Sequence, residues 1–193
     1  MMKETVKVGI IGSQFISTIH AESLMRCQSA EMLAVASPSV GNAKSFAAKH
    51  DIPHHFIDYR ELLAMAEIDM VVIGIPNHVH CEAVVAAAEA GKHIVIEKPL
   101  CLNMEEADLM VEAAKKANVK LMYAEELCFA PKYVRLKQLL DSGALGKPTL
   151  IKQSEKHDGP HAPHFWDVEQ SGGGVVMDMG CHAIEFFRWM LGR

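Results

Sequence analysis

Short apolar runs alternate with segments of helical spacing between residues 6 and 123. Continuous runs rich in β-branched residues predict buried strands, and apolar positions that recur every three or four residues predict helices. The predicted strands are 6–11, 32–36, 55–57, 70–75, 93–96 and 119–123, and the predicted helices are 15–26, 42–50, 59–66, 80–90 and 105–118. Continuous apolar strands separated by helices indicate a parallel sheet covered on both faces. The pattern therefore predicts an α/β fold with a doubly wound parallel sheet of the Rossmann type.

The pattern changes after Glu125. A helix is predicted over 132–141, a strand over 149–154, a loop rich in Gly, His and Pro over 157–174, and a last helix over 178–191. We therefore predict a dinucleotide-binding domain over 1–125 and the beginning of a second α/β domain over 126–193.

The composition argues against nucleic-acid and membrane partners and favours a reducing compartment. With a net charge of −5 and scattered lysines and arginines, the chain lacks the basic patch expected of a nucleic-acid or anionic membrane surface. Five dispersed cysteines suit reduced thiols better than a disulfide framework. The first residues have no signal-peptide pattern, and no apolar run approaches the roughly 20 residues of a membrane span. We expect a soluble, cytoplasmic protein without nucleic-acid or membrane partners.

The junction after the first predicted strand is a candidate phosphate loop. It reads Gly-Ser-Gln-Phe-Ile-Ser over residues 12–17, where a dinucleotide fingerprint has Gly-x-Gly-x-x-Gly/Ala. Gly12 fills the first position, while Gln14 and Ser17 replace the second and third glycines. Because a helix N-terminus still offers amides and a positive dipole to phosphate, we predict that Gly12, Gln14, Phe15 and Ile16 contact a cofactor. The alternative is an ordinary tight turn.

Ser37, after the second predicted strand, occupies the position that contacts the cofactor ribose. An NAD-preferring site usually has Asp or Glu there, and its absence removes the repulsion of a 2′-phosphate. The sequence thus predicts NAD or NADP with a mild preference for NADP. The preference is mild because no arginine is adjacent and Lys44 is a distant substitute.

Glu97-Lys98-Pro99 follows the apolar run 93–96, at the strand end where open α/β sheets bind their ligands. An ammonium there can stabilise negative charge that develops on a substrate oxygen. The alternative is a surface lysine at a strand end, as an isolated tripeptide would suggest.

A set of motifs in a fixed order resembles one known family. The motifs are Val-Gly-Ile-Ile-Gly at 8–12, Pro76-Asn77-x-x-His80, Ala-Gly-Lys-His at 90–93, Glu97-Lys98-Pro99, and Gly-Gly-Gly at 172–174 followed by Asp178-x-x-x-His182. Together they are similar to the glucose–fructose oxidoreductase / inositol dehydrogenase / MocA (Gfo/Idh/MocA) family. This resemblance implies an N-terminal Rossmann domain, a C-terminal α/β domain built on a large, mostly antiparallel sheet, and hydride transfer between NAD(P) and a carbinol of a sugar or cyclitol.

The resemblance also implies roles for individual residues. Gly12 would lie at the pyrophosphate, and Pro76, Asn77 and His80 would line the cofactor. Glu97 and Lys98 would face the nicotinamide and the substrate. Most of the family's C-terminal sheet is absent from these 193 residues, including a surface often used to dimerise. A homo-oligomer or a missing C-terminal partner is therefore open, as is a non-catalytic nucleotide-binding module or one half of a split assembly.

The predicted catalytic residues are Lys98, Asp178 and His182. An imidazole suits the base role at neutral pH, so His182 would take the hydroxyl proton. Lys98 would stabilise the alkoxide and act as a proton-relay partner. A spacing of four residues puts Asp178 and His182 on one helix face, so Asp178 would orient the imidazole or hold a neighbouring substrate hydroxyl, and orienting is the role assigned to it. The alternative is a helix cap at Asp178 and a core histidine at His182.

The loop over 157–174 suggests contacts to substrate rather than a metal. His157, His161 and His164 have spacings that would suit ligands on a helix, but Pro160 and Pro163 interrupt any helix there. We predict no metal, and expect His161 and His164 to approach substrate hydroxyls. Trp166 either packs over a sugar ring or lies in the core.

Overall fold

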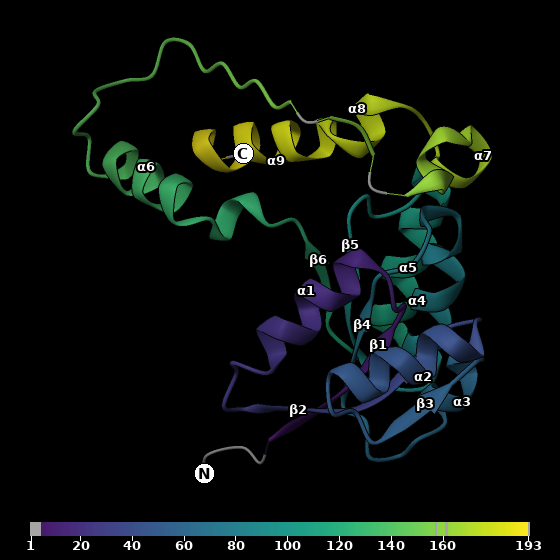
Figure 1. The fold of residues 1–193 in the computed structure, drawn as a ribbon. Coiled ribbons are helices and arrows are strands. Elements are labelled where there is room, and N and C mark those ends of the chain that lie inside the picture. Colours follow the sequence, from purple (N-terminus) through teal and green to yellow (C-terminus); the bar gives the residue numbers. More distant parts are fainter. Residues whose placement is uncertain (1–4, 157, 161, 193) are drawn as a thin grey trace. The chain divides into compact units, whose positions relative to one another are not determined.

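The apolar runs form a six-stranded sheet in the computed structural model, which describes residues 5–156, 158–160 and 162–192 (Figure 1). Its strands are β1 (Val6–Ile11), β2 (Ala30–Ala36), β3 (His54–Phe56), β4 (Met70–Ile73), β5 (His93–Glu97) and β6 (Leu121–Ala124). They lie in the order β3-β2-β1-β4-β5-β6, and the pairs β1–β2, β1–β4, β2–β3 and β4–β5 are parallel. The doubly wound fold predicted from the sequence is confirmed.

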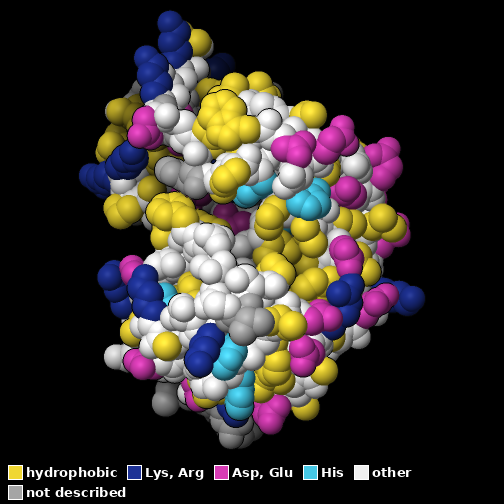
Figure 2. Space-filling view, turned by 45° about the vertical axis from the view of Figure 1, so that its right-hand side comes forward, with side chains coloured by type: hydrophobic (Ala, Val, Ile, Leu, Met, Phe, Trp, Pro, Cys, Tyr) yellow, Lys and Arg dark blue, Asp and Glu magenta, His cyan; other side chains and the backbone are white. Residues whose placement is uncertain are grey.

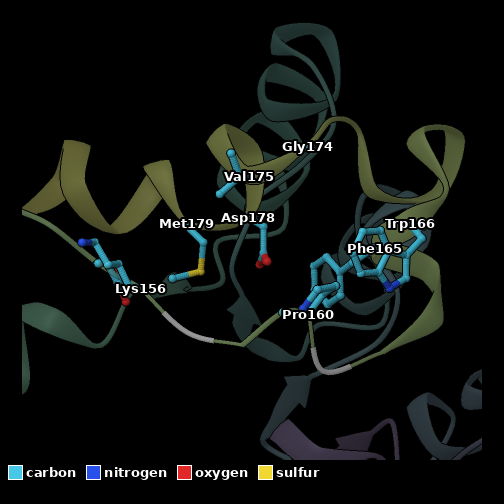
Figure 3. A pocket seen from close by; sticks show the side chains of 10 residues that line it. Lys156, Pro160, Phe165, Trp166, Gly174, Val175, Asp178 and Met179 are labelled. Carbon is cyan, nitrogen blue, oxygen red and sulfur yellow. The ribbon is translucent and has the colours of Figure 1, made fainter.

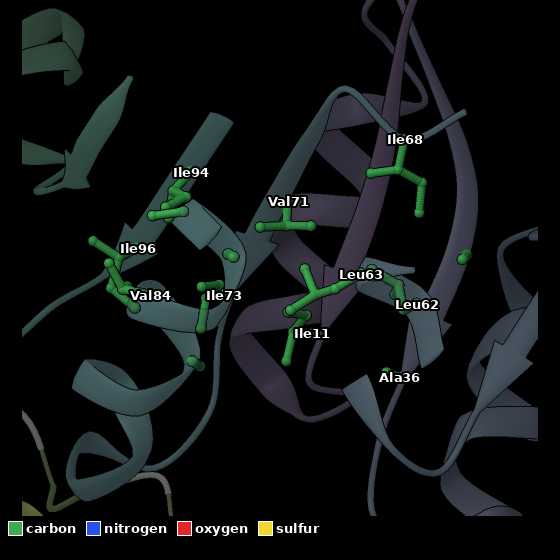
Figure 4. Close-up of a cluster of buried hydrophobic side chains, with 14 of the residues drawn as sticks. Ile11, Ala36, Leu62, Leu63, Ile68, Val71, Ile73, Val84, Ile94 and Ile96 are labelled. Carbon is green, nitrogen blue, oxygen red and sulfur yellow. The ribbon is translucent and has the colours of Figure 1, made fainter. Parts of the chain in front are cut away.

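Helices cover both faces of this sheet. They are α1 (Phe15–Leu24), α2 (Val40–Lys49), α3 (Tyr59–Leu63), α4 (His80–Glu89) and α5 (Met104–Lys116), with a 3₁₀ turn η1 (Asn77–Val79) before α4. Ile10 packs with residues of α1 and α2, whereas its neighbour Ile11 packs with residues of α3, α4 and α5. Figure 4 shows the second of these clusters. Because both faces of each strand are buried, the strands appear in the sequence as unbroken apolar runs.

The chain divides into two compact units, Met1–Tyr123 and Ala124–Arg193. The second unit contains η2 (Leu127–Phe129), α6 (Pro131–Asp141), η3 (Pro163–Trp166), α7 (Val168–Ser171), α8 (Val175–Asp178) and α9 (Gly180–Leu191). Its small core consists of Leu127, Phe186 and Met190, and Tyr133 of α6 lies edge-on to Phe186 with ring centroids 5.0 Å apart.

Two predictions for the second unit were wrong. Residues 149–154 form no strand, because a strand needs a neighbour to complete its hydrogen bonds and the described part of this unit contains none; the Leu150 side chain there is exposed. The single helix predicted over 178–191 is two helices, since α8 ends at Asp178 and α9 begins at Gly180. The loop over 157–174 also includes the short helical turns η3 and α7.

The surface carries charges of both signs. On the face shown in Figure 2, acidic and basic side chains lie among hydrophobic ones, as expected for a chain with a net charge of −5. None of the helices in the described part of the chain is both long enough and apolar enough to traverse a membrane.

Candidate functional site

The carboxyl ends of β1 and β4 form the candidate ligand-binding edge of the first unit. The chain runs outward from β1 to β2 and β3 on one side and from β4 to β5 and β6 on the other, so the strand order reverses between these two neighbours. In open α/β sheets, ligands bind in the crevice at such a reversal. Gly12 follows β1 and Gly74 follows β4, and the Gly74 N–H donates to the Ile11 carbonyl at 2.8 Å.

Gly12 makes a turn that other residues do not tolerate. Its φ is +116°, and a Cβ atom on it would lie 2.1 Å from the carbonyl oxygen of Gly74. The loop after β1 therefore passes directly against the end of β4, which brings its backbone to the crevice.

The N-terminus of α1 begins immediately after this turn. Gln14 is its N-cap residue, and within the described chain the Gln14 side chain makes no capping hydrogen bond. The first turn carries no acidic residue, so nothing there opposes an anion at the positive end of the helix. Gln14 and Phe15 are exposed. Ser17, at the third glycine position, is buried with its Oγ donating to the Gly74 carbonyl at 3.4 Å. This helix end is therefore the candidate site for the diphosphate of a dinucleotide.

Ser37 lies at the end of β2, where the ribose of such a ligand would be expected. It is buried, and its Oγ accepts a hydrogen bond from the Oγ of Ser13 at 2.8 Å. The two hydroxyls tie the loop after β1 to the loop after β2. The Ser37 hydroxyl remains able to donate to a further acceptor.

Glu97 is a buried carboxylate at the end of β5. Its Oε1 lies 2.8 Å from Nε2 of His20 on α1, and its Oε2 accepts the Lys98 N–H at 3.0 Å. His20 was not predicted as a site residue, because this contact spans 77 residues along the chain and the α1 pattern carries no signal for it. Lys98 is partly buried, and the Lys98–Pro99 peptide is cis.

His80 is a buried histidine at the start of α4. It is only 1% exposed, and its contact with a cofactor stays a prediction. Its Nδ1 lies 2.9 Å from the Pro99 carbonyl oxygen, and its Nε2 lies 2.9 Å from that of Ile75. Burial lowers the pKa of this imidazole. His80 therefore joins the end of β4 to the Glu-Lys-Pro turn. Asn77 is also buried.

The second unit contains a buried carboxylate–imidazole pair, and its carboxylate was not among the predicted site residues. The Nδ1 of His182 on α9 lies 2.5 Å from Oε1 of Glu125, and both residues are buried. Glu125 follows β6 directly, just as Lys98 follows β5. The position of a polar residue after an apolar strand is thus the one signal for Glu125 that the sequence contains.

Glu126 brings a second carboxylate near the same imidazole. One possible metal-ligand atom from each of Glu125, Glu126 and His182 lies within 4.8 Å of the other two, so this set could hold a metal ion. However, the 2.5 Å from Glu125 to His182 is a hydrogen-bond length. Two ligands bound at about 2 Å to one tetrahedral ion lie about 3 Å apart. His157 and His161, the other histidines considered for metal, lie outside the described residues.

The Asp178 side chain lines a pocket of about 560 Å³ in the second unit. Figure 3 shows its carboxylate pointing toward the space that Phe165, Met179 and Pro160 border. Trp166 also lines this pocket and is 79% exposed, so it does not belong to the core. The ring of His164 lies 4.3 Å from that of Phe165.

The predicted pairing of Asp178 with His182 on one helix face was wrong, since the break at Met179 places the two residues on different helices. The structure brings Glu125 to the Nδ1 of His182. The catalytic roles of Lys98, Asp178 and His182 stay predictions.

Comparison with known proteins matches both units. Residues 6–125 match a model described as an oxidoreductase family with an NAD-binding Rossmann fold, and residues 133–193 match a Gfo/Idh/MocA C-terminal domain. A myo-inositol 2-dehydrogenase of Thermotoga maritima is 30% identical over 188 residues, which is 97% of this chain and 55% of that protein.

Solved structures agree with these matches. A probable dehydrogenase from Thermotoga maritima superposes with a TM-score of 0.90 at 30% identity, covering 97% of this chain and 55% of that one. A levoglucosan dehydrogenase in complex with NADH gives 0.84 at 28% identity, with 97% and 54% covered. The chain spans about half the length of the curated relatives it matches.

Proposed function

Because the chain belongs to the Gfo/Idh/MocA family of oxidoreductases, we propose that it serves hydride transfer between a nicotinamide dinucleotide and a carbinol of a sugar or cyclitol. The observation that carries this proposal is the loop at Gly12. Its φ of +116° and its close approach to Gly74 present the N-terminus of α1 to a diphosphate at the reversal of strand order. The related dehydrogenases with inositol and levoglucosan in their names support the substrate class.

The chemistry needs a group for the hydroxyl proton and a group for the developing alkoxide. A bound nicotinamide supplies the hydride acceptor or donor. His182 acts as the base that takes the hydroxyl proton, and Lys98 stabilises the negative charge on the carbinol oxygen. The bonds from Glu97 to His20 and to the Lys98 N–H hold the backbone of the turn that carries this lysine.

The pocket at Asp178 suits a polyhydroxylated ring. A carboxylate accepts hydrogen bonds from two neighbouring hydroxyls, and the exposed face of Trp166 offers an apolar surface to the C–H face of a sugar. A volume of about 560 Å³ lies within the range of small-molecule sites. We assign Asp178 the role of binding substrate hydroxyls in this pocket, in place of orienting His182.

Either NAD or NADP fits the residues at the ribose position. A relative is known in complex with NADH. Ser37 brings no negative charge to repel a 2′-phosphate. The mild preference for NADP depends on this missing charge and stays a prediction. The Ser13–Ser37 hydroxyl pair is the group that would meet the ribose or its phosphate.

A second candidate is a non-catalytic dinucleotide-binding module, or one half of an assembly completed by a second copy or another chain. The observation that favours it is that the turn at Gly12 and the N-terminus of α1 lie within the first unit. In this case the chain binds the dinucleotide without turnover.

Titration of NADH and NADPH, followed by nicotinamide fluorescence and by melting temperature, tests the binding step. Saturable binding with a rise in melting temperature is expected. Oxidation of inositols and aldoses in the presence of the preferred cofactor then tests turnover. Binding without turnover supports the module, and a folded sample that binds neither cofactor refutes both candidates.

Lys98→Met separates catalysis from binding. We expect turnover to fall by about 100-fold or more while the Kd for NADH stays within about threefold. Lys116→Met, at an exposed position on α5, is the matched control and should change neither quantity. Wild-type turnover in Lys98→Met would remove this lysine from the proposed mechanism.

A further inference from the structure

The second unit contains a buried ionisable pair, Glu125 and His182, in which the carboxylate has no role predicted from the sequence. Glu125 is 4% exposed and His182 is 3% exposed, and their Oε1 and Nδ1 atoms lie 2.5 Å apart. Two such groups are expensive to bury unless each is satisfied by a partner. Glu125 and His182 therefore satisfy each other by a hydrogen bond. The chemistry of the pair depends on whether the carboxylate oxygen or the imidazole nitrogen carries the proton.

The carboxylate of Glu125 is anchored on its other side. Its Oε2 accepts the Leu127 N–H at 3.1 Å, within η2. Leu127 in turn belongs to the apolar cluster with Phe186, which follows His182 by one helical turn on α9. One oxygen is thus held by the backbone while the other faces the imidazole.

This arrangement fixes the tautomer of His182. An ionised carboxylate can only accept hydrogen bonds, so Nδ1 must donate, and a neutral imidazole then carries its lone pair on Nε2. We propose that Glu125 is a positioning residue that keeps His182 in the Nδ1-protonated tautomer, with Nε2 as the proton acceptor for the carbinol. The catalytic part of this inference depends on the function proposed above.

The proton and electrons balance in this scheme. The carbinol O–H bond breaks as a new N–H bond forms at Nε2, which gives a doubly protonated imidazolium. The carbinol C–H bond gives its electron pair and hydrogen to the nicotinamide as hydride, and the carbon becomes a carbonyl. Glu125 stays ionised throughout, and its charge stabilises the imidazolium.

Other ionisable groups face the pair. Oε2 of Glu126 lies 3.6 Å from the same Nδ1, but this side chain is 63% exposed. The pKa of the nearby Cys128 is raised by burial and then by the charges of Glu125 and Glu185. Glu126 therefore offers a matched control, since it carries the same charge and adjoins Glu125 in the sequence, yet makes a longer contact.

The first arm of the test is direct and needs no turnover. Nitrogen-15 NMR of the uniformly labelled full chain, with the His182 ring assigned through its own backbone, reports which ring nitrogen carries the proton. We expect Nδ1–H in the wild type and in Glu126→Gln, and a loss or mixture of this tautomer in Glu125→Gln. A wild-type ring protonated on Nε2, or a carboxylic acid that donates to Nδ1, overturns the proposal.

The second arm measures turnover with the preferred cofactor and substrate. We expect Glu125→Gln to lower kcat by about 100-fold, with the substrate KM within twofold, and to shift the acidic limb of the pH–rate profile downward because a nearby negative charge is lost. Glu126→Gln should leave kcat within twofold. Equal kcat for Glu125→Gln and wild type overturns the proposal. So does a loss in both variants that added Zn²⁺ reverses, since it would indicate a metal site.

The two arms separate this inference from the proposed function. A wild type that shows the Nδ1–H tautomer but gives no hydride transfer with any polyol refutes the proposed function and leaves the role of Glu125 in fixing the tautomer supported. A wild type that turns over substrate with His182 in the other tautomer refutes the role of Glu125 alone.

Discussion

Gly12→Ala tests whether the loop after β1 is built for a dinucleotide. The new Cβ would lie 2.1 Å from the Gly74 carbonyl oxygen and 2.8 Å from Ser17 Oγ, at a φ of +116°. Strain at such a backbone angle costs about 1–3 kcal/mol. The contact with the Gly74 backbone cannot be relieved by a rotamer change, so the loop must also move away from β4. We expect the free energy of unfolding to fall by about 3 kcal/mol or more, and NADH affinity to fall at least about tenfold.

Gly91→Ala is the matched control for this experiment. Gly91 also has a positive φ, +73°, but a Cβ there would meet nothing within 4 Å. Its expected cost is therefore the backbone term alone, about 1–2 kcal/mol, with NADH affinity unchanged. Urea unfolding gives the stabilities and nicotinamide fluorescence gives the affinities. If Gly12→Ala loses no more stability than Gly91→Ala and binds NADH as the wild type does, the reasoning about this loop is wrong.

Three further predictions concern the cofactor, the pH dependence of stability and the core. Ser37→Asp should reduce NADPH affinity relative to NADH affinity by at least about tenfold, because it adds a negative charge where a 2′-phosphate would lie. Competitive titrations measure the ratio of the two affinities. An unchanged ratio would show that the ribose does not bind at Ser37. Burial lowers the pKa of His50, so as the pH falls below about 6.5 the unfolded chain takes up a proton before the folded chain does, and stability falls. His50→Phe should flatten this decline by up to about 1.4 kcal/mol per pH unit in urea unfolding at a series of pH values, and an equally steep decline would contradict it. Leu62→Ala, at a fully buried position, should cost about 3 kcal/mol, whereas the exposed Met122→Ala should cost less than about 0.5 kcal/mol by the same assay.

The fold could be predicted from the sequence wherever an element depends on the local pattern of apolar and polar residues. Ile10 and Ile11 show why, since adjacent residues of one strand pack into clusters on opposite faces, and a run without polar interruptions is the direct result. The prediction failed over 149–154, where an apolar and β-branched composition met no partner strand in the described unit. The prediction of a single helix also failed at Met179. The chain breaks there between two helices, although no glycine or proline at that position indicates a break.

The site was predictable to the extent that its residues follow strands. Gly12 and Lys98 stand at strand ends, and each was selected because a motif accompanies that position. Glu125 stands at a strand end as well, but no motif accompanied it. His20 had no local signal, because a contact across 77 residues is created by the fold. Burial of His80 was likewise invisible in the sequence, where a histidine after a Pro-Asn turn fits a ligand contact and a structural contact equally well.

The motifs that carry the family resemblance include residues that support the site from within the fold. The Nζ of Lys92 donates to the carbonyls of Met65 and Ile68 at 2.7 and 2.9 Å, and burial lowers its pKa. The two ring nitrogens of His80 each lie 2.9 Å from a carbonyl oxygen, one after β4 and one in the turn after β5, and the N–H of the ring donates to one of them. Both side chains use their polar atoms on backbone oxygens, which fixes the loops on either side of β5 and so the turn that carries Lys98. A chain can therefore keep this order of motifs because its scaffold requires them, whether or not it turns over a substrate. The family therefore follows from the scaffold motifs, whereas the proposed catalysis depends on Lys98 and on the Glu125–His182 pair.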